Sequence, residues 1–326
     1  MTPRVSVVVT CCDLGEYLDE AVGSVLAQTV PVSEIVVVND GSTDAATCRL
    51  LADYRRERTR VLHTERRGLP AARNAGARET TGEYLCMLDA DDLLEPTYVE
   101  RSLAALQADP ELGFASHWLR AFGIDSWEWT PPRIALPGML LVNPVNGAAL
   151  MRRAMFDALG GFDETMTDGC EDWEFWIRAI SAGWKGTIVP EFLYRYRQRA
   201  DSMSRTMYRV PGAAALRRQL VERHPDLYAA HLDALLAVRD DEIRTVSSRL
   251  WRLESEWHTD LAVQLQWSED NREDRLLVER EAGRDRVLED AAAERARLAA
   301  EVRALRTSWS WRITAPLRAA LGWVRR

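Results

Sequence analysis

The sequence predicts an α/β fold with a mostly parallel sheet and flanking helices, followed by a long helical region. Apolar, β-branched runs alternate with helix-like periodicity through the N-terminal third. Polar clusters directly follow several of these runs. A charged stretch without proline from 232 to 306 indicates the helical region.

Length and charge limit the possible classes of protein. The 326 residues predict about two structural units, at about 150 residues each. The net charge of −8 argues against general nucleic-acid binding, which needs a concentrated basic surface. We expect three segments: a catalytic domain over 1–212, a helical or coiled-coil region over 213–306, and a tail over 307–326.

The first strand–helix units are readable from periodicity. Residues 5–12 form a continuous apolar run, as a buried parallel strand should. Apolar residues at helical spacing follow over 14–25. A second buried strand is predicted at 35–38, and either Ser42 or Asp44 would cap the next helix.

The next two units follow the same pattern. A short strand is predicted at 61–63, and Pro70 begins a helix that runs to about residue 80. A fourth strand at 84–88 ends at an acidic cluster, and Pro96 begins another helix. In such sheets ligands bind at the carboxyl ends of strands, where the polar clusters stand.

Residues 112–200 are less regular. The Trp-rich segment 127–132 is interpreted as a loop that either packs as a lid or receives a sugar on an indole face. A helix is predicted from Asp172 to Ala182, with Gly183 as its terminator and with Trp173 and Trp176 in the core.

The acidic cluster of Asp89, Asp91 and Asp92 favours a hard cation. Carboxylates gathered at one strand end repel one another, and oxygen ligands suit Mg²⁺ or Mn²⁺ with diphosphate oxygens completing the shell. The alternative is a solvated acidic turn that caps a helix.

Two further carboxylates are candidates for chemistry. Asp40 ends a buried strand, where it would accept a hydrogen bond from a nucleobase, and Gly41 allows close backbone approach. The alternative is a simple turn with Asp44 as a cap. Asp172 stands beside Glu171 at a helix start, whose dipole keeps a general base ionised, although plain capping fits too.

Five segments together resemble glycosyltransferase family 2, and the resemblance covers about residues 4–205. It implies the GT-A fold. The segments, in chain order, are Val5-Ser6-Val7-Val8-Val9-Thr10, Val38-Asn39-Asp40-Gly41-Ser42-Thr43-Asp44, Ala72-Arg73-Asn74-Ala75-Gly76, Leu88-Asp89-Ala90-Asp91-Asp92 and Glu171-Asp172-Trp173-Glu174.

The resemblance implies roles for matching residues. Asp172 would be the base that deprotonates the acceptor hydroxyl, and Glu171 would orient either Asp172 or the acceptor. Asp91 and Asp89 would hold Mn²⁺ or Mg²⁺. Arg73 would support either the phosphates or the local fold. The residues implied to bind the nucleotide sugar are Thr10, Asp13, Asp40, Gly41, Ser42, Arg73, Asp89 and Arg199.

Two positions depart from the family pattern. Many members carry an aromatic residue where this chain has Cys12, which implies weaker stacking on the base. Many also carry a histidine where this chain has Arg199. A guanidinium can contact diphosphate as a fixed cation but cannot ligate a metal, so donor oxygens and water would complete the metal shell.

The C-terminal region leaves alternatives open. A heptad-like seam predicts either a coiled coil, which would make a homodimer, or a single solvated helix. Its residues are Ile243, Val246, Leu250, Leu253, Trp257, Leu298, Val302 and Leu305. The basic, aromatic tail would lie either on an anionic membrane or on another subunit.

The cellular setting is also an expectation. The five cysteines match no zinc pattern, and those in strand-like runs suit a reducing compartment. No signal peptide or spanning segment is expected. The predicted location is the cytoplasm, peripheral to the inner face of the cytoplasmic membrane if the tail binds lipid.

These observations lead to one functional hypothesis and two rivals. The hypothesis is an inverting, metal-dependent transfer of sugar from a nucleoside-diphosphate sugar, UDP-sugar first, to a glycan or lipid-linked acceptor in cell-envelope polysaccharide synthesis. A tail resembling those of some bacterial cell-surface glycosyltransferases hints at that setting. One rival is an inactive nucleotide-sugar-binding scaffold at the membrane. The other, a nucleotidyltransferase, lacks the glycine-rich loop it would need near the first strand.

Overall fold

The computed structural model describes residues 3–131, 133–202 and 212–270, with short helical pieces at 292–293, 295–297 and 299–300. The chain divides into two compact units, Met1–His224 and Pro225–Arg326. The seam residues Leu298, Val302 and Leu305 and the predicted tail 307–326 lie outside the described residues.

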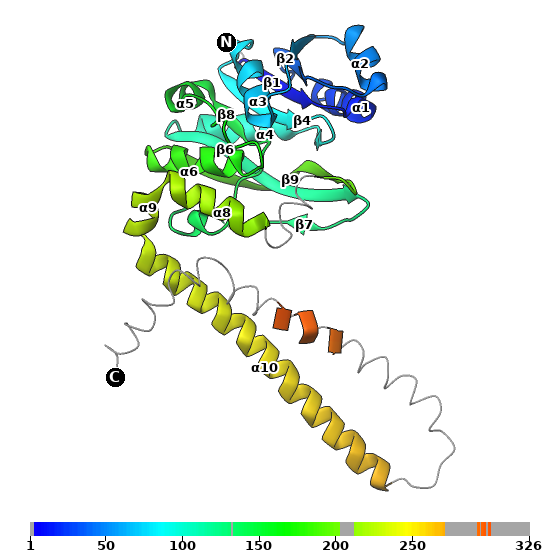
Figure 1. The fold of residues 1–326 in the computed structure, drawn as a ribbon, viewed down its shortest axis with the longest axis vertical. Coiled ribbons are helices and arrows are strands. Elements are labelled where there is room, and N and C mark those ends of the chain that lie inside the picture. The colour runs from blue at the N-terminus through cyan, green and yellow to red at the C-terminus, as the bar shows by residue number, and fades with distance from the viewer. Residues whose placement is uncertain are drawn as a thin grey trace. The chain divides into compact units, whose positions relative to one another are not determined.

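Four parallel strands form the first half of the sheet, as the sequence predicts. β1 (Val5–Cys11) lies between β2 (Glu34–Asp40) and β4 (Tyr84–Asp89), and β3 (Thr59–Thr64) pairs with β2. Figure 1 shows these strands in blue and cyan beside the helices that connect them. The predicted strands were shorter by one or two residues at several ends.

The two faces of β1 are covered by different helices. Val5, Val7, Val9 and Cys11 belong to the core that also contains the apolar face of α1. The alternate residue Val8 faces the other way, toward Gly76 of α3, where an added Cβ would lie 2.3 Å from the valine Cγ1. Since successive residues of a strand face opposite sides of the sheet, β1 is buried along its whole length, Ser6 and Thr10 included.

The helices of this half begin close to where the sequence predicts them. Asp44 caps the second, since its carboxylate accepts a hydrogen bond from the Thr47 backbone at 2.7 Å. Of the two predicted caps, Asp44 is therefore the one used. The four helices are α1 (Gly15–Leu26), α2 (Ala45–Ala52), α3 (Leu69–Arg78) and α4 (Tyr98–Ala108).

The second half of the sheet is mixed, which the sequence analysis did not predict. The two long strands β6 (Leu112–Gly123) and β9 (Lys185–Gln198) run parallel to each other. Short antiparallel strands connect and extend them: β8 (Leu150–Arg152) joins β4 to β6, and β5 (Leu93–Leu94) pairs with β9. The sheet order is β3-β2-β1-β4-β8-β6-β9-β5.

The interpretation of 127–132 as a loop was wrong at its centre. β7 (Glu128–Trp129) pairs antiparallel with β6 as the return arm of a hairpin. The predicted helix near 172 is confirmed as α6 (Glu171–Ser181), followed by Gly183 at a φ of +89°. Trp173 and Trp176 are both buried, as predicted.

Shorter elements complete the first unit and lead into the second. They are η1 (Gly138–Leu140), α5 (Arg153–Leu159) and α8 (Gly212–Arg223). The second unit contains α9 (Pro225–Ala230) and α10 (Leu232–Asp270), a helix of 39 residues. The predicted helical region is confirmed as far as residue 270, and residues 271–291 lie outside the described part of the chain. The coiled coil stays a prediction. None of the helices in the described ranges has a stretch apolar and long enough to span a bilayer.

Candidate active site

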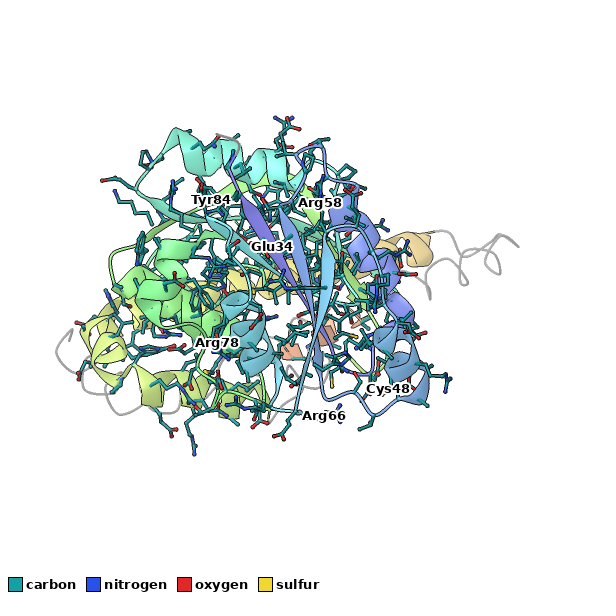
Figure 2. The ribbon with its side chains drawn as sticks, turned by 90° about the horizontal axis from the view of Figure 1, so that it is seen from above. Glu34, Cys48, Arg58, Arg66, Arg78 and Tyr84 are labelled. Atoms are coloured by element: carbon teal, nitrogen blue, oxygen red, sulfur yellow. The ribbon has the colours of Figure 1, made fainter. Side chains whose placement is uncertain are left out.

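The carboxyl ends of the first-half strands carry the predicted polar clusters. Parallel pairing sets Thr10 of β1 opposite Asp89 of β4, and Cys11 opposite Asn39 of β2. Figure 2 looks at the sheet from above: Arg66, just past β3, lies at the opposite end of the strands from Arg58 and Tyr84. The clusters at 10–13, 39–44 and 89–92 therefore meet at one edge.

Arg73 links the acidic cluster of β4 to the carboxylates of α6. Its Nη1 donates to Glu171 Oε1 at 2.6 Å, and its Nη2 donates to Asp89 Oδ1 at 3.1 Å. Thr10 Oγ1 also donates to Asp89 Oδ1, at 2.8 Å. The Arg73 side chain is only 3% exposed. The structure thus brings together four predicted residues, Thr10, Arg73, Asp89 and Glu171, around one guanidinium group.

Asp172 has the surroundings of a general base. Although part of its surface is exposed, burial among protein atoms and then the charge of Glu171 raise the pKa of Asp172, and Arg73 lowers it, with a net value of about 7. The Trp173 backbone N–H donates to Asp172 Oδ1 at 2.7 Å, and Asn143 Nδ2 donates to Oδ2 at 3.2 Å. The expectation that the helix dipole keeps Asp172 ionised was therefore wrong, because burial outweighs the dipole. A carboxyl with a pKa near 7 is partly ionised at neutral pH and can still accept a proton.

Asp91 is paired with the arginine that stands at the family's histidine position. Arg199 Nε lies 2.9 Å from Asp91 Oδ2, and its Nη1 lies 3.2 Å from Asp201. Burial, followed by the charge of Asp89, raises the pKa of Asp91 above its usual value, while Arg199 lowers it. The third carboxylate of the cluster, Asp92, is buried and bonded to Tyr194 Oη and the Arg197 backbone, so it supports the fold.

The residues at this edge fit a divalent cation in part. Asp91 and Asp89 are hard oxygen ligands, and crowding of like charges is what a cation would relieve. Within the described ranges, no three side chains of His, Cys, Asp or Glu gather into a metal site. Mg²⁺ and its substitutes are commonly held by one or two carboxylates plus substrate phosphates, which is the arrangement these residues permit.

The loop after β1 is tied to the loop after β2. Asp13 Oδ1 accepts hydrogen bonds from the backbones of Thr43 and Asp44, at 2.6 and 2.8 Å, and Asp13 N donates to Ser42 Oγ. The Asp44 N–H, with smaller contributions that include Arg66, lowers the pKa of Asp13. Asp13 and Ser42 therefore shape this edge of the site together.

Asp40 is more enclosed than its predicted role suggested. Its two carboxylate oxygens accept the backbone N–H groups of Arg67 and Gly68, each at 2.9 Å, and it is 5% exposed. Gly41 follows at a φ of +59°, and a Cβ there would lie 2.5 Å from Arg66 N. The close approach inferred for Gly41 is thus made by the chain's own 66–68 loop. A base contact to Asp40 would use a remaining lone pair of these oxygens.

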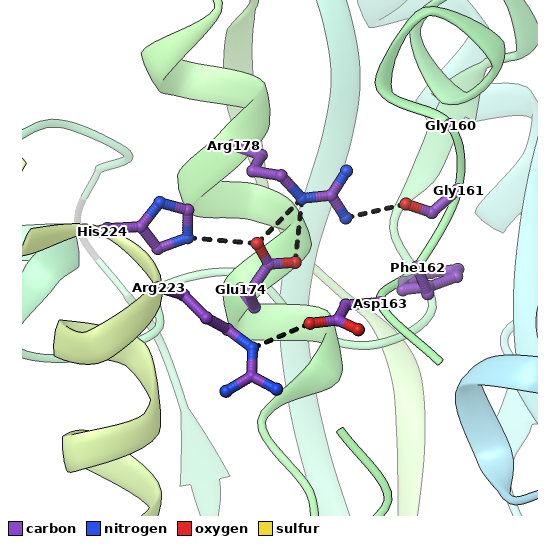
Figure 3. Close-up of a pocket in the computed structure, with 8 residues that line it drawn as sticks. All are labelled: Gly160, Gly161, Phe162, Asp163, Glu174, Arg178, Arg223 and His224. Atoms are coloured by element: carbon purple, nitrogen blue, oxygen red, sulfur yellow. Dashed lines mark hydrogen bonds and ion pairs between the residues drawn. The ribbon is translucent and has the colours of Figure 1, made fainter. Parts of the chain in front are cut away.

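A cavity of about 370 Å³ opens on the other face of α6 (Figure 3). Its charged lining is already paired. Glu174 accepts from Arg178 Nε at 2.8 Å and lies 3.1 Å from His224 Nε2, while Arg223 Nε donates to Asp163 at 2.7 Å. His224, directly after α8, thus contacts α6, and Arg223 of α8 is bound to Asp163, which precedes α6. Glu174, the last residue of the fifth family segment, therefore has a structural role.

Three residues near the site were not predicted. Arg66 Nη2 contacts both Cys12 Sγ and Asp13 Oδ2 at 2.9 Å, and Arg197 Nε donates to the Asp91 carbonyl at 2.7 Å. Asn143 contacts Asp172, as described above. Arg197 adjoins the recognised segment around Arg199 and was within reach of sequence reasoning, whereas nothing in the sequence near Asn143 marks it.

Comparison with known proteins identifies relatives. The family model described as "Glycosyl transferase family 2" matches residues 6–224. The glycosyltransferase GlyA of Streptococcus pneumoniae is 36% identical over 115 residues, which is 34% of this chain but only 16% of GlyA. This chain therefore matches a small part of that relative's length.

Two solved structures are similar in fold. S. aureus TarS (1–349) with UDP-GlcNAc has a TM-score of 0.52 at 20% identity, covering 62% of this chain and 60% of that one. The mannosyltransferase PcManGT of Pyrobaculum calidifontis, with GDP-Man and Mn²⁺, has a TM-score of 0.50 at 23% identity, covering 63% and 60%. The sheet and its flanking helices match the GT-A fold.

Proposed function

Because this chain belongs to glycosyltransferase family 2 and is a glycosyltransferase, we propose that it inverts the anomeric centre of a sugar while transferring it from a nucleoside-diphosphate sugar. The donor to test first is a UDP-sugar, followed by a GDP-sugar. TarS and PcManGT, which share the fold, were solved with UDP-GlcNAc and with GDP-Man. The proposed acceptor is a hydroxyl of a glycan or of a lipid-linked sugar.

One observation carries the proposal. The buried Arg73 side chain connects Asp89, at the end of the acidic cluster, to Glu171, the neighbour of Asp172. The donor's diphosphate would lie beside Asp89 and Asp91, and the acceptor hydroxyl beside Asp172. This arrangement sets a leaving group and a base on one framework, as in-line displacement requires.

The proposed step transfers one proton and exchanges one bond at the anomeric carbon for another. Asp172 takes the proton from the acceptor hydroxyl as the acceptor oxygen forms a bond to the anomeric carbon. The bond from that carbon to the diphosphate oxygen breaks on the opposite side, so the configuration inverts and nucleoside diphosphate leaves. Glu171, held by Arg73, keeps Asp172 at the start of α6.

We propose Mn²⁺ or Mg²⁺ as the cofactor, with Asp91 and Asp89 as protein ligands and the diphosphate and water completing the shell. When bound, such a cation supplies charge neutralisation for the departing diphosphate. Arg199, as a fixed cation beside Asp91, would add a second positive charge toward the same group. The residues proposed to line the nucleoside part of the site are Thr10, Asp13, Asp40, Gly41 and Ser42.

The setting remains part of the proposal. We place the enzyme in the cytoplasm, in cell-envelope polysaccharide synthesis, peripheral to the inner membrane face if the basic tail binds lipid and dimeric if α10 forms a coiled coil. Flotation with anionic vesicles of the full chain and of a chain ending at residue 306, together with light scattering, would test both parts.

The experiment that tests the function is a donor assay with a matched variant. Wild type and Asp172→Asn are incubated with UDP-GlcNAc or GDP-mannose, Mn²⁺ and a panel of lipid-linked and free glycan acceptors. We expect transfer by the wild type and a drop of about 10²–10⁴-fold in Asp172→Asn. Equal rates in the two proteins would show that Asp172 is not the base.

One rival has an observation in its favour. The ion pair between Arg199 and Asp91 already neutralises a proposed metal ligand, which suits a scaffold that binds nucleotide sugar without turning it over. The same assay separates the two functions. A scaffold would bind the donor but neither hydrolyse it nor transfer its sugar, whatever the acceptor.

A further inference from the structure

The segment from Met139 of η1 to Asn146, which precedes β8, is fastened at both of its ends. Trp173 Nε1 donates to the Met139 carbonyl at 2.7 Å, which ties its beginning to α6. At its far end Asn146 N donates to Ser116 Oγ at 3.2 Å, and Asn146 Nδ2 donates to the His117 carbonyl at 3.0 Å. The residues between these anchors are therefore held in register with α6 and β6.

Asn143 lies in that segment, and both ends of its side-chain amide are used. Oδ1 accepts the Val145 backbone N–H at 3.1 Å, and Nδ2 donates to Asp172 Oδ2 at 3.2 Å. Rotating the amide by half a turn would set an oxygen against the carboxylate and an NH₂ against an N–H group. The network thus fixes which end faces Asp172.

Four other groups affect the ionisation of Asp172 through their charge or through a backbone hydrogen bond. On its own helix, Glu171 opposes ionisation and the Trp173 N–H favours it; from β4, Asp89 opposes it; from α3, Arg73 favours it. Arg73 divides its hydrogen bonds between Glu171 and Asp89, so it acts on Asp172 through charge. Asn143 instead donates a hydrogen bond directly to the carboxylate.

From this geometry we infer that Asn143 is a positioning residue for the base. Its Nδ2 holds Asp172 Oδ2 toward the acceptor hydroxyl and stabilises the ionised carboxylate that takes the proton. The inference rests on the proposed function, because it gives Asn143 a task in the same proton transfer. During that transfer Oδ2 gains the hydroxyl proton on its second lone pair, and the bond from Asn143 persists on the first.

A titration that needs no turnover tests the positioning. Infrared difference spectra across pH, compared with those of Asp172→Asn, identify the carboxyl band of Asp172 and its midpoint. We expect Asn143→Ala to raise that midpoint by about one unit, because a bond to the charged form is lost. Asn143→Asp should raise it further: it can still accept from Val145, yet it donates nothing and adds a negative charge.

Rates across pH provide the second readout. With a midpoint one unit higher, transfer by Asn143→Ala should be about ten-fold below wild type at pH 6 and within about two-fold at pH 9. Val142→Ala is the matched control, since Val142 is the adjacent residue, 53% exposed, and has an apolar side chain. Its profile should superimpose on that of the wild type. Thermal unfolding confirms that each variant is folded.

The outcomes separate two kinds of failure. If the midpoint and the pH profile of Asn143→Ala and Asn143→Asp equal those of wild type, or if their rates fall by one factor at every pH, Asn143 does not position the base. If the wild type transfers no sugar from any donor, the proposed function fails, while the infrared midpoint still tests the contact between Asn143 and Asp172.

Discussion

Arg73 and Glu171 lie 98 positions apart in the chain, yet their guanidinium and carboxylate groups are 2.6 Å apart in a buried ion pair. The same guanidinium contacts Asp89, so one side chain of α3 joins the end of β4 to the start of α6. Leaving either Arg73 or Glu171 without its partner would be costly, because both side chains are buried. The relationship makes α3 the support on which both halves of the proposed site are aligned.

Replacing Arg73 should therefore destabilise the protein strongly. We expect Arg73→Met to lower the free energy of unfolding by about 3–5 kcal/mol, because it leaves Glu171 buried without its partner. Arg78→Met on the same helix is the control. Arg78 is 61% exposed and 3.8 Å from Glu164, so its loss should cost less than about 1 kcal/mol. Urea unfolding measures both, and equal losses would contradict the bridging role of Arg73.

The pH dependence of transfer should follow the ionisation of Asp172. Burial and neighbouring Glu171 raise the pKa of Asp172 to about 7. A base must be deprotonated to accept a proton, so the rate should rise with pH through a midpoint near 7. Single-turnover rates from pH 5 to 9 at saturating donor measure it. A rate that is flat over this range would show that a different group takes the proton.

The same shift predicts a gain in stability when the base is removed. The folded-state pKa of Asp172 lies above its unfolded value, so the folded state binds more protons and loses stability as pH rises from about 4 through 7. Asp172→Asn removes this loss. The Tm of Asp172→Asn minus the Tm of wild type should therefore be larger at pH 8 than at pH 5. Scanning calorimetry at the two pH values measures this difference in Tm. If the difference is the same at both, the pKa of the Asp172 carboxyl is not raised in the folded state.

The ion pair of Asp91 predicts competition with the metal. Arg199 Nε occupies one side of Asp91 Oδ2 at 2.9 Å, so Arg199→Ala should bind Mn²⁺ more tightly than wild type in the absence of nucleotide. Electron paramagnetic resonance of free Mn²⁺ measures this without turnover. Asp91→Asn is the opposite control and should bind less. If Arg199→Ala binds Mn²⁺ no better than wild type, the cation does not share Asp91 with the arginine.

Gly41 provides a test of the loop beside Asp40. A Cβ at this residue would meet Arg66 N at 2.5 Å, and its φ is +59°. Gly41→Ala should cost about 1–3 kcal/mol of stability and weaken nucleotide binding, because the 66–68 loop must move. Gly23→Ala in α1, where a Cβ meets nothing within 4 Å, should instead be neutral or stabilising. Similar effects of the two changes would contradict the close approach.

Local periodicity was enough to predict the first half of the sheet. The segments that became β1, β2 and β4 are short, mostly apolar runs followed by polar clusters, so each is visible as a strand from its own residues. β6 and β9 were missed because their long segments mix apolar with polar and charged residues, and their pairing joins positions some 70 residues apart. No local pattern specifies such pairing, and β6 carries polar residues such as Ser116 and His117 that are buried only in the assembled sheet.

Candidate-site residues could be predicted where the adjacent sequence already places them at the end of a strand or the start of a helix. Asp89 and Asp172 were found because acidic residues at strand and helix ends are visible in sequence. The bonds of Asp40 to the Arg67 and Gly68 backbones, and the contact of Asn143 with Asp172, depend on loops brought together by folding. Arg73 was recognised, but its bridging role needed the position of α6.

The central claim is that nucleotide and metal bind together at Asp91 while Asp172 serves only the chemical step. Calorimetric titration of UDP, GDP and dTDP, each with and without Mn²⁺, tests it most directly in wild type, Asp91→Ala and Asp172→Asn. The account predicts that one nucleotide binds only with Mn²⁺, that this binding is lost in Asp91→Ala, and that it is retained in Asp172→Asn. The account would be contradicted if nucleotide binding depended on neither Mn²⁺ nor Asp91, or if the folded wild type bound no nucleotide.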